Sequence, residues 1–189
     1  KHLSTYGDYY DSAFLSKINN DGTREWTKVL GTKSFDFGET ITISSDGSVY
    51  IAGQKNNAAF ITKFKNDGTE EWSKTLGTVN DVTEITSDSE GSIFLTGSTL
   101  YDFEDQTNYY YPSGQRSSDA FITKISSDGI TEWSKLIGPV SDTKEYQPDA
   151  YGYSVAVGKD EYIYVLGSTE DDLDGEISSG EVDLFITKY

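Results

Sequence analysis

Short runs in which apolar and polar residues alternate follow one another along the chain. In residues 59–64, for example, Phe and Thr alternate with Ile and Lys, which is typical of a half-buried β-strand. Other runs, such as residues 49–52 and 162–166, are nearly all apolar and predict strands that neighbouring elements cover on both faces. No segment shows the helical period of an amphipathic helix. The pattern therefore predicts an all-β protein.

Turn sequences join these runs in pairs. Residues 45–48 read Ser-Asp-Gly-Ser between two runs, and residues 66–69 read Asn-Asp-Gly-Thr between the next two. Asp-Gly between alternating runs is a strong hairpin signal, because Gly adopts the positive φ of a tight turn at little steric cost. We therefore expect two hairpins in one unit, with strands at residues 40–44, 49–53, 59–64 and 71–76.

The hairpins recur as internal repeats. The segment from Asp11 to Gly31 returns from Asn57 to Gly77 and again from Asp119 to Gly138, and its opening returns at the C-terminal end. Units of four strands with no helical period are typical of β-propeller blades. The sequence thus predicts a single β-propeller over residues 1–189, as a fragment with about three to four blades. The predicted blades are 1–30 (partial), 40–77, 82–138 and 153–189 (partial).

A Trp stands four residues after the turn Gly in three of the repeats: Trp26, Trp72 and Trp133. This constant offset predicts a packing wedge between adjacent blades. Residues 13–18 and 184–188 are the same strand of the repeat, so an exchange of end strands leaves one strand over. We therefore expect closure by the rest of a parent chain or by self-association, because exposed sheet edges need covering.

Charge narrows the range of partners. The chain has 32 Asp and Glu against 15 Lys and Arg, for a net charge of −17, which repels phosphate groups and excludes nucleic acid as a partner. A cation, above all Ca²⁺, is favoured, and an acidic surface that only maintains solubility is the competing interpretation. No run reaches the about 18 apolar residues of a membrane-spanning segment, so membrane insertion is not expected.

Connections on one side of the predicted blades vary in length, whereas the turns on the other side stay short. Loops on a rigid scaffold are common binding sites, and these combine Tyr with carboxylates. Such side chains suit the stacking of sugar rings or contact with a protein, while packing of the same Tyr onto the blades is the competing interpretation. The predicted ligand-face residues are Tyr101, Asp102, Tyr109, Tyr110, Tyr111, Tyr146 and Tyr151.

Residues 170–181 have the spacing of an EF-hand calcium loop, with carboxylates at positions 1, 3, 5 and 12 and Gly at position 6. Against this reading, position 1 is Glu and the predicted flanking elements are strands, so a solvated acidic loop competes with it. The predicted ligands are Glu170, Asp172, Asp174, the backbone carbonyl of Glu176, a water near Ser178, and Glu181.

Catalytic signals are sparse. The chain has no Cys and a single His, His2, which removes cysteine nucleophiles and His-based triads from this segment. Asp and Glu are so abundant that pairs of them carry no information about glycoside hydrolysis without geometry. The sequence therefore predicts a protein that is not an enzyme.

Residues 119–129 read Asp-Ala-Phe-Ile-Thr-Lys-Ile-Ser-Ser-Asp-Gly, and residues 91–99 read Gly-Ser-Ile-Phe-Leu-Thr-Gly-Ser-Thr. With Trp133 and the Ser-Lys-Leu-Ile-Gly after it, these phrases resemble the bacterial SBBP-type β-propeller repeat, and the resemblance covers essentially the whole chain. It implies a large exported or surface-attached parent protein without an assigned catalytic site.

These observations together predict a non-catalytic binding, adhesion or scaffold module, extracellular or at the cell surface, whose protein or glycan partner contacts the Tyr-rich acidic loop face. The alternatives are a Ca²⁺-stabilised spacer in a giant exported protein and a secreted enzyme acting on polysaccharide.

Overall fold

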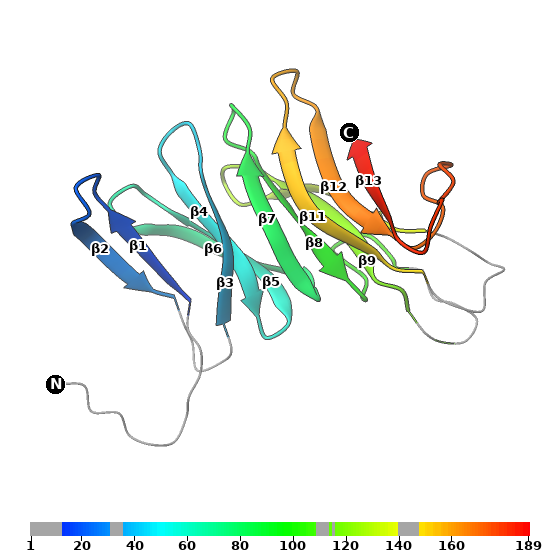
Figure 1. The fold of residues 1–189 in the computed structure, drawn as a ribbon. Helices are drawn as coiled ribbons and strands as arrows, with labels where there is room; N and C mark the ends of the chain where they lie inside the picture. Colours follow the sequence, from blue (N-terminus) through cyan, green and yellow to red (C-terminus); the bar gives the residue numbers. More distant parts are fainter. Residues whose placement is uncertain (1–12, 31–35, 109–113, 115, 140–147) are drawn as a thin grey trace.

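The computed structural model describes residues 13–30, 36–108, 114, 116–139 and 148–189. Within these ranges the chain forms thirteen antiparallel strands in four small sheets and no helix (Figure 1). The sheets stand in an open row, with β1 and β2 at one end and β13 at the other. The prediction of an all-β protein is confirmed.

Each sheet pairs its strands in the order of the sequence. The first sheet holds β1 (Phe14–Ile18) and β2 (Arg24–Val29); the second holds β3 (Asp36–Ile43), β4 (Val49–Lys55), β5 (Ala58–Phe64) and β6 (Glu70–Thr78); the third holds β7 (Asp81–Ser87), β8 (Ile93–Thr99), β9 (Asp119–Ile125) and β10 (Thr131–Ile137); the fourth holds β11 (Ala150–Val157), β12 (Ile163–Thr169) and β13 (Asp183–Lys188). The predicted ranges 40–77 and 82–138 thus each enclose most of one four-stranded sheet.

The predicted tight turns form at Asp-Gly sequences. At the turn between β3 and β4, the N–H of Gly47 donates to the carbonyl of Ser44 at 2.9 Å. Gly47 has φ of 83°, a conformation in which a residue with Cβ is strained. The Asp46 carboxylate accepts the hydroxyl of Ser44 and, at 2.8 Å, the N–H of Ser48. The local sequence therefore satisfies the backbone of its own turn.

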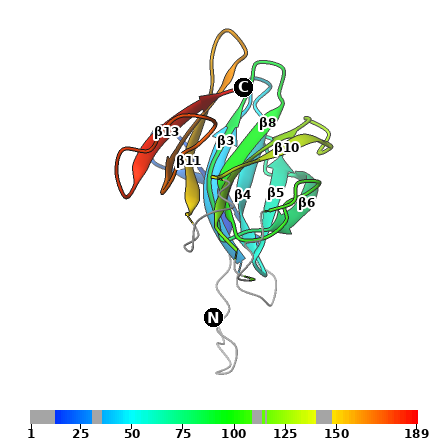
Figure 2. The same cartoon turned by 90° about the vertical axis from the view of Figure 1, so that its right-hand side faces the viewer.

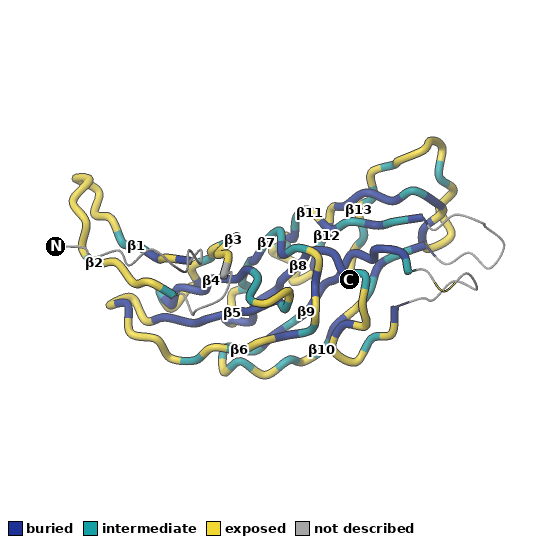
Figure 3. The backbone as a smooth tube through the Cα atoms, turned by 90° about the horizontal axis from the view of Figure 1, so that it is seen from below, coloured by how far each residue is buried: buried dark blue, intermediate teal, exposed yellow. Residues whose placement is uncertain are grey.

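Apolar faces of neighbouring sheets pack against one another and form the core. Figure 3 shows the buried segments gathered in the second and third sheets, while the first sheet is largely exposed. Between these two buried sheets, Tyr50 and Ile61 pack with Leu95 and Phe121. Similar clusters join the first sheet to the second and the third sheet to the fourth. Burial of these side chains is the main force that holds the row together.

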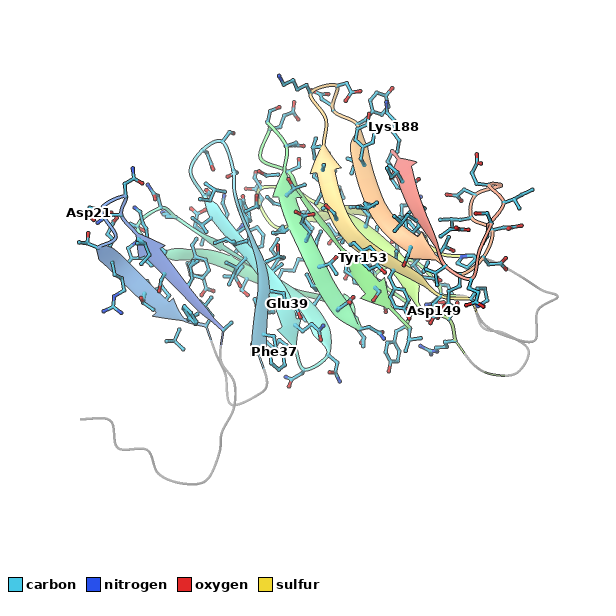
Figure 4. All side chains as sticks on the ribbon, in the orientation of Figure 1. Asp21, Phe37, Glu39, Asp149, Tyr153 and Lys188 are labelled. Carbon is cyan, nitrogen blue, oxygen red and sulfur yellow. The ribbon has the colours of Figure 1, made fainter. Side chains whose placement is uncertain are left out.

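The first strand of each larger sheet carries a one-residue β-bulge at the same place in the register. The bulged residues are Glu39 in β3, Thr83 in β7 and Tyr153 in β11. Figure 4 labels Glu39 on β3 and Tyr153 on β11, and β7 lies between these two strands in the row. A bulge bends its strand and redirects the side chain, so these three residues can reach across to the next strand.

Two of the bulged residues bond to the following sheet. The Glu39 carboxylate accepts the N–H of Val82 at 3.2 Å, and the Thr83 hydroxyl donates to the carbonyl of Gly152 at 2.9 Å. Burial raises the pKa of Glu39, and the N–H of Val82 opposes that rise. Polar bonds along the bulges thus supplement the apolar contacts between sheets.

Trp side chains wedge between sheets as the sequence predicts. The indole Nε1 of Trp72 donates to the carbonyl of Ser127 at 3.1 Å. Gly129 in the same turn brings its backbone against the ring, because a Cβ there would lie 3.1 Å from it. Trp26 lies in the same way against Gly68 of the second sheet. The prediction of a wedge between sheets is confirmed at both Trp residues.

One prediction about coverage is wrong. The apolar run at residues 162–166 was expected to be covered on both faces, yet Leu166 is 38% and Tyr162 is 47% exposed. The corresponding strands β4 and β8 are buried because another sheet packs on each of their faces. Figure 2 views the row from the end of the fourth sheet, where no described sheet covers this face.

None of the described segments is a helix long and apolar enough to span a membrane.

Candidate functional site

The long connections gather on one side of the row. In Figure 1 the tight turns stand at the upper ends of the strands, whereas the connections that follow β8 and β12 begin at the lower ends. We call this lower side the loop face. It is the side on which the sequence analysis expected a ligand.

Two of these connections begin with the same small hairpin. The N–H of Phe103 bonds the carbonyl of Gln106 at 2.9 Å, and the N–H of Leu173 bonds the carbonyl of Glu176 at 3.1 Å. An Asp carboxylate closes each hairpin, since Asp102 and Asp172 accept the N–H of the residue six positions later. The shared sequence is Ser-Thr-x-x-Asp followed by an apolar residue, at residues 98–103 and 168–173. This spacing could have revealed the equivalence, which the sequence analysis missed.

The apolar residue of each hairpin anchors it to the sheets. Phe103 is fully buried and stacks on Phe121 with the ring centroids 4.3 Å apart. Leu173 joins the cluster between the third and fourth sheets. The two connections are therefore held against the sheets at their starting points.

The predicted calcium ligands in 170–181 are turned to different partners. Asp172 accepts the N–H of Ser178 at 2.8 Å, the carbonyl of Glu176 accepts from Leu173, and the Glu170 carboxylate accepts the N–H of Asp149 at 3.2 Å. Asp174 and Glu181 are exposed. Within the described residues, no group of three His, Cys, Asp or Glu side chains is placed to hold one metal ion. Calcium binding by residues 170–181 stays a prediction.

The ligand-face residues divide into three groups. Tyr101 is exposed at the surface, with the guanidinium of Arg116 4.9 Å from its ring centroid, and Asp102 closes its hairpin. Tyr151 bonds Asp149, as described below. The remaining candidates lie outside the described residues: Tyr109, Tyr110, Tyr111 and Tyr146.

Asp149 connects the third and fourth sheets on the loop face, where Figure 4 places it just before β11. One of its carboxylate oxygens accepts the N–H of Ser118 at 2.7 Å, and the other accepts the hydroxyl of Tyr151 at 2.8 Å. The N–H of Ala150 donates to the carbonyl of Ser118 at 2.7 Å. Burial, followed by this bond to Asp149, raises the pKa of Tyr151 to about 12.

Asp119, the first residue of β9, is buried beside this carboxylate. It is 6% exposed, and no hydrogen bond or ion pair to its carboxylate forms among the described residues. Burial, with a further contribution from the charge of Asp149, raises the pKa of Asp119 to about 7. Its Oδ1 lies against Gly138, where a Cβ would come within 2.0 Å of that oxygen. The fold thus makes room for a carboxyl group without supplying a partner for it.

Further buried oxygens near Asp119 also lack partners. The Asn108 amide nitrogen donates to the carbonyls of Thr99 and Ser117 at 3.2 and 3.3 Å, but its Oδ1 is unbonded. The hydroxyls of Ser117 and Ser118 are likewise buried and unbonded. We call the following residues the oxygen cluster: Asn108, Ser117, Ser118, Asp119 and Asp149. Sequence analysis did not single it out, because Ser and Asn are ordinary loop residues and the tertiary fold alone buries them.

No protein-family model and no curated protein sequence matches the chain. Among solved structures, the chain is similar to a protein of unknown function from Bacteroides caccae, with 14% sequence identity and a TM-score of 0.47. The match covers 84% of this chain and 50% of that protein, so the chain spans about half of the neighbour's length. The resemblance to the SBBP-type repeat stays a prediction.

A shallow hollow of about 400 Å³ lies on the outer face of the fourth sheet. Its walls include the side chains of Leu173, Ile177, Leu184 and Ile186. Apolar surface of this kind on a folded protein marks a contact with another molecule more often than a catalytic centre.

Proposed function

We propose that the protein is a non-catalytic scaffold and binding module whose sheets are consecutive blades of a β-propeller. The Trp wedges, the bulges at one register position and the packing of each sheet on the next support this assignment. The parent protein is then secreted or attached to the cell surface, as the resemblance to the SBBP-type repeat implies. In this proposal the faces of the sheets are the assembly surfaces and the loop face is a second contact region.

The outer face of the fourth sheet is the observation that carries this proposal. Leu184 and Ile186 of β13 are 76% and 74% exposed. Ile186 follows the repeat Phe as Ile61 and Ile122 do, and both of those residues are fully buried between sheets. The exposed face of the fourth sheet therefore corresponds to the face with which the second and third sheets each pack against the next sheet.

The opposite end of the row exposes the complementary face. Phe14 of β1 is 71% exposed, whereas its repeat equivalent Phe60 is 6% exposed and packs against Leu15 of the first sheet. A second copy of the chain can therefore place its first sheet on the fourth sheet of its neighbour. Contact between two different faces is head to tail, and such contacts build rings or open filaments.

Sedimentation velocity over a range of protein concentrations tests this proposal. We expect concentration-dependent association, abolished in Ile186→Lys, because a charge at this position cannot be buried against an apolar face. Ile130→Lys is the matched control, since Ile130 is 65% exposed in a turn and the substitution is the same. A monomer at every concentration, or association that survives Ile186→Lys, would contradict the proposal.

The loop face is the second contact region of this proposal. Tyr101 is exposed, and the guanidinium of Arg116 lies against its ring. Exposed aromatic rings are frequent anchors for protein and sugar ligands. A glycan array and a Tyr101→Ala variant test this role. Binding that is unchanged in Tyr101→Ala would remove this residue from the contact.

A further inference from the structure

We propose that Asp119 and Asp149 bind a Ca²⁺ ion in the oxygen cluster between the third and fourth sheets. This site is separate from the predicted calcium loop at residues 170–181, and it does not depend on the self-association proposed above.

Asp119 is a buried carboxyl group beside a second carboxylate. Asp119 is 6% exposed, and its carboxylate forms no hydrogen bond with the described residues. The second carboxylate, Asp149, is close enough to disfavour its ionised form. No Lys or Arg forms an ion pair with either group within the described residues. An ionised carboxylate buried without a partner is costly, so such a group is protonated, paired or bound to a metal ion.

Buried polar atoms in the neighbouring residues also lack partners. In the described part of the chain, five buried side-chain atoms have no partner, and three of them belong to this one region: Asn108 Oδ1, Ser117 Oγ and Ser118 Oγ. Hydrogen bonds place these residues beside the carboxylates, since the N–H of Ser118 donates to Asp149 and the Asn108 amide donates to the carbonyl of Ser117. Ser117 and Ser118 also directly precede Asp119 in the chain. Buried polar atoms normally have partners, so unpaired oxygens concentrated at one place favour the binding of a ligand there.

The donor set selects the kind of ligand. All of the available ligand atoms are oxygens, which suit a hard cation. The chain has no Cys to bind zinc or copper through sulfur. Two carboxylates balance a divalent charge, and the amide and hydroxyl oxygens add neutral ligands, as is common for calcium at coordination numbers of about 6–8. Magnesium requires a near-ideal octahedron and retains its waters, which a set of mixed neutral oxygens suits less well.

The position of the site indicates its effect. Asp119 begins β9 of the third sheet, and Asp149 directly precedes β11 of the fourth. The backbone bonds between Ser118 and residues 149–150 already join the two sheets here. An ion that binds both carboxylates therefore ties the residue before β11 to the first residue of β9. One predicted ligand of the 170–181 loop, Glu170, also points to this region, because its carboxylate accepts the N–H of Asp149.

Thermal unfolding of the whole chain in EDTA and in 1 mM CaCl₂ tests the site. We expect the melting temperature to rise by about 5 °C with Ca²⁺, because a ligand that binds only the folded state stabilises it. Asp119→Asn should abolish the rise, while melting in EDTA at or above the wild-type temperature, since a neutral amide replaces an unpaired buried charge. Asp172→Asn is the matched control in the other loop and should keep the full rise.

Terbium luminescence gives a readout that needs no variant. Tyr151 bonds Asp149 directly, so excitation of Tyr should sensitise Tb³⁺ bound in the cluster, and Ca²⁺ should displace it. Ser117→Ala removes one neutral oxygen and should weaken Ca²⁺ binding by about tenfold, which keeps the proposal testable if Asp119→Asn does not fold. Three outcomes would overturn it: no Ca²⁺-dependent rise in the wild type, a rise that persists in Asp119→Asn, or an equal rise with Mg²⁺ or Na⁺.

Discussion

The indole nitrogen of Trp72 donates a 3.1 Å hydrogen bond to the carbonyl oxygen of Ser127, which lies in the next sheet of the row. The corresponding nitrogen of Trp26 is buried but has no hydrogen-bond partner. Both rings thus lie against a turn glycine of the next sheet, while Trp72 adds this hydrogen bond and an edge-on contact with Tyr50.

Trp72→Phe should therefore destabilise the protein more than Trp26→Phe. Both variants lose apolar area, but only the first also removes a hydrogen bond to the Ser127 carbonyl, which still accepts from Lys63 Nζ at 3.3 Å. The lost bond adds about 1 kcal/mol. Urea titration followed by circular dichroism measures the difference in the free energy of unfolding. An equal loss in the two variants would show that the hydrogen bond makes no net contribution.

Two turn glycines separate backbone strain from packing. Gly22 and Gly129 both have φ of 83°, but a Cβ at Gly22 would meet no atom within 4 Å, whereas one at Gly129 would lie 3.1 Å from the Trp72 ring. Gly22→Ala should cost about 1 kcal/mol from its backbone conformation alone. Gly129→Ala should cost about 1–2 kcal/mol more, because it also displaces the ring. Chemical denaturation of both variants tests this order.

Acid should weaken the turn between β3 and β4. The hydroxyl of Ser44, followed by the N–H of Ser48, lowers the pKa of Asp46 from 3.8 to about 2. The folded-state pKa is depressed, so this stabilisation is present above the unfolded value and is lost as the pH falls through the folded value.

Stability measured from pH 6 to pH 2 checks this effect. The free-energy advantage of the wild type over Asp46→Ala should be constant down to about pH 4 and shrink between about pH 4 and pH 2. An advantage that does not change with pH would mean that the charge of Asp46 is not involved.

Salt should strengthen self-association. The net charge of −17 makes two copies repel each other, while the proposed contact between Ile186 and Phe14 is apolar. Screening reduces the repulsion and leaves apolar burial in place, so the dissociation constant should fall as NaCl is raised from 20 to 300 mM. A dissociation constant that rises with salt would indicate an interface held by ion pairs instead.

Local signals in the sequence were sufficient for the strands and turns. Alternation of side chains predicts β5 to within one residue, because successive side chains of a strand point to opposite faces. The structure buries both of these faces. The Asp-Gly turns were equally predictable, since φ at Gly47 and Gly129 is a property of a few adjacent residues. The start of β3 was harder to predict. This strand begins at Asp36 rather than at residue 40, because its pairing with β4 continues beyond the bulge at Glu39.

The candidate site could not be predicted in the same way. The spacing of residues 170–181 resembles a calcium loop, but a hairpin anchored by Leu173 directs Asp172 to Ser178 and Glu170 to Asp149. Spacing along a chain sets which residues are near in sequence, and the hairpin decides which way each carboxylate faces.

The sequence by itself determined the all-β class, the repeated hairpins, the Trp wedges and the acidic charge, because each follows from side-chain period, turn chemistry or composition over short distances. Only the tertiary structure decided that Asp119 and Asp149 come together among unpaired oxygens and that Leu184 and Ile186 face outward. Burial and the distance between charges depend on how separate sheets pack. Asp119 begins a strand of the third sheet, and Asp149 directly precedes a strand of the fourth. The same Ile that is core in one sheet is surface in another, solely because of what packs against it.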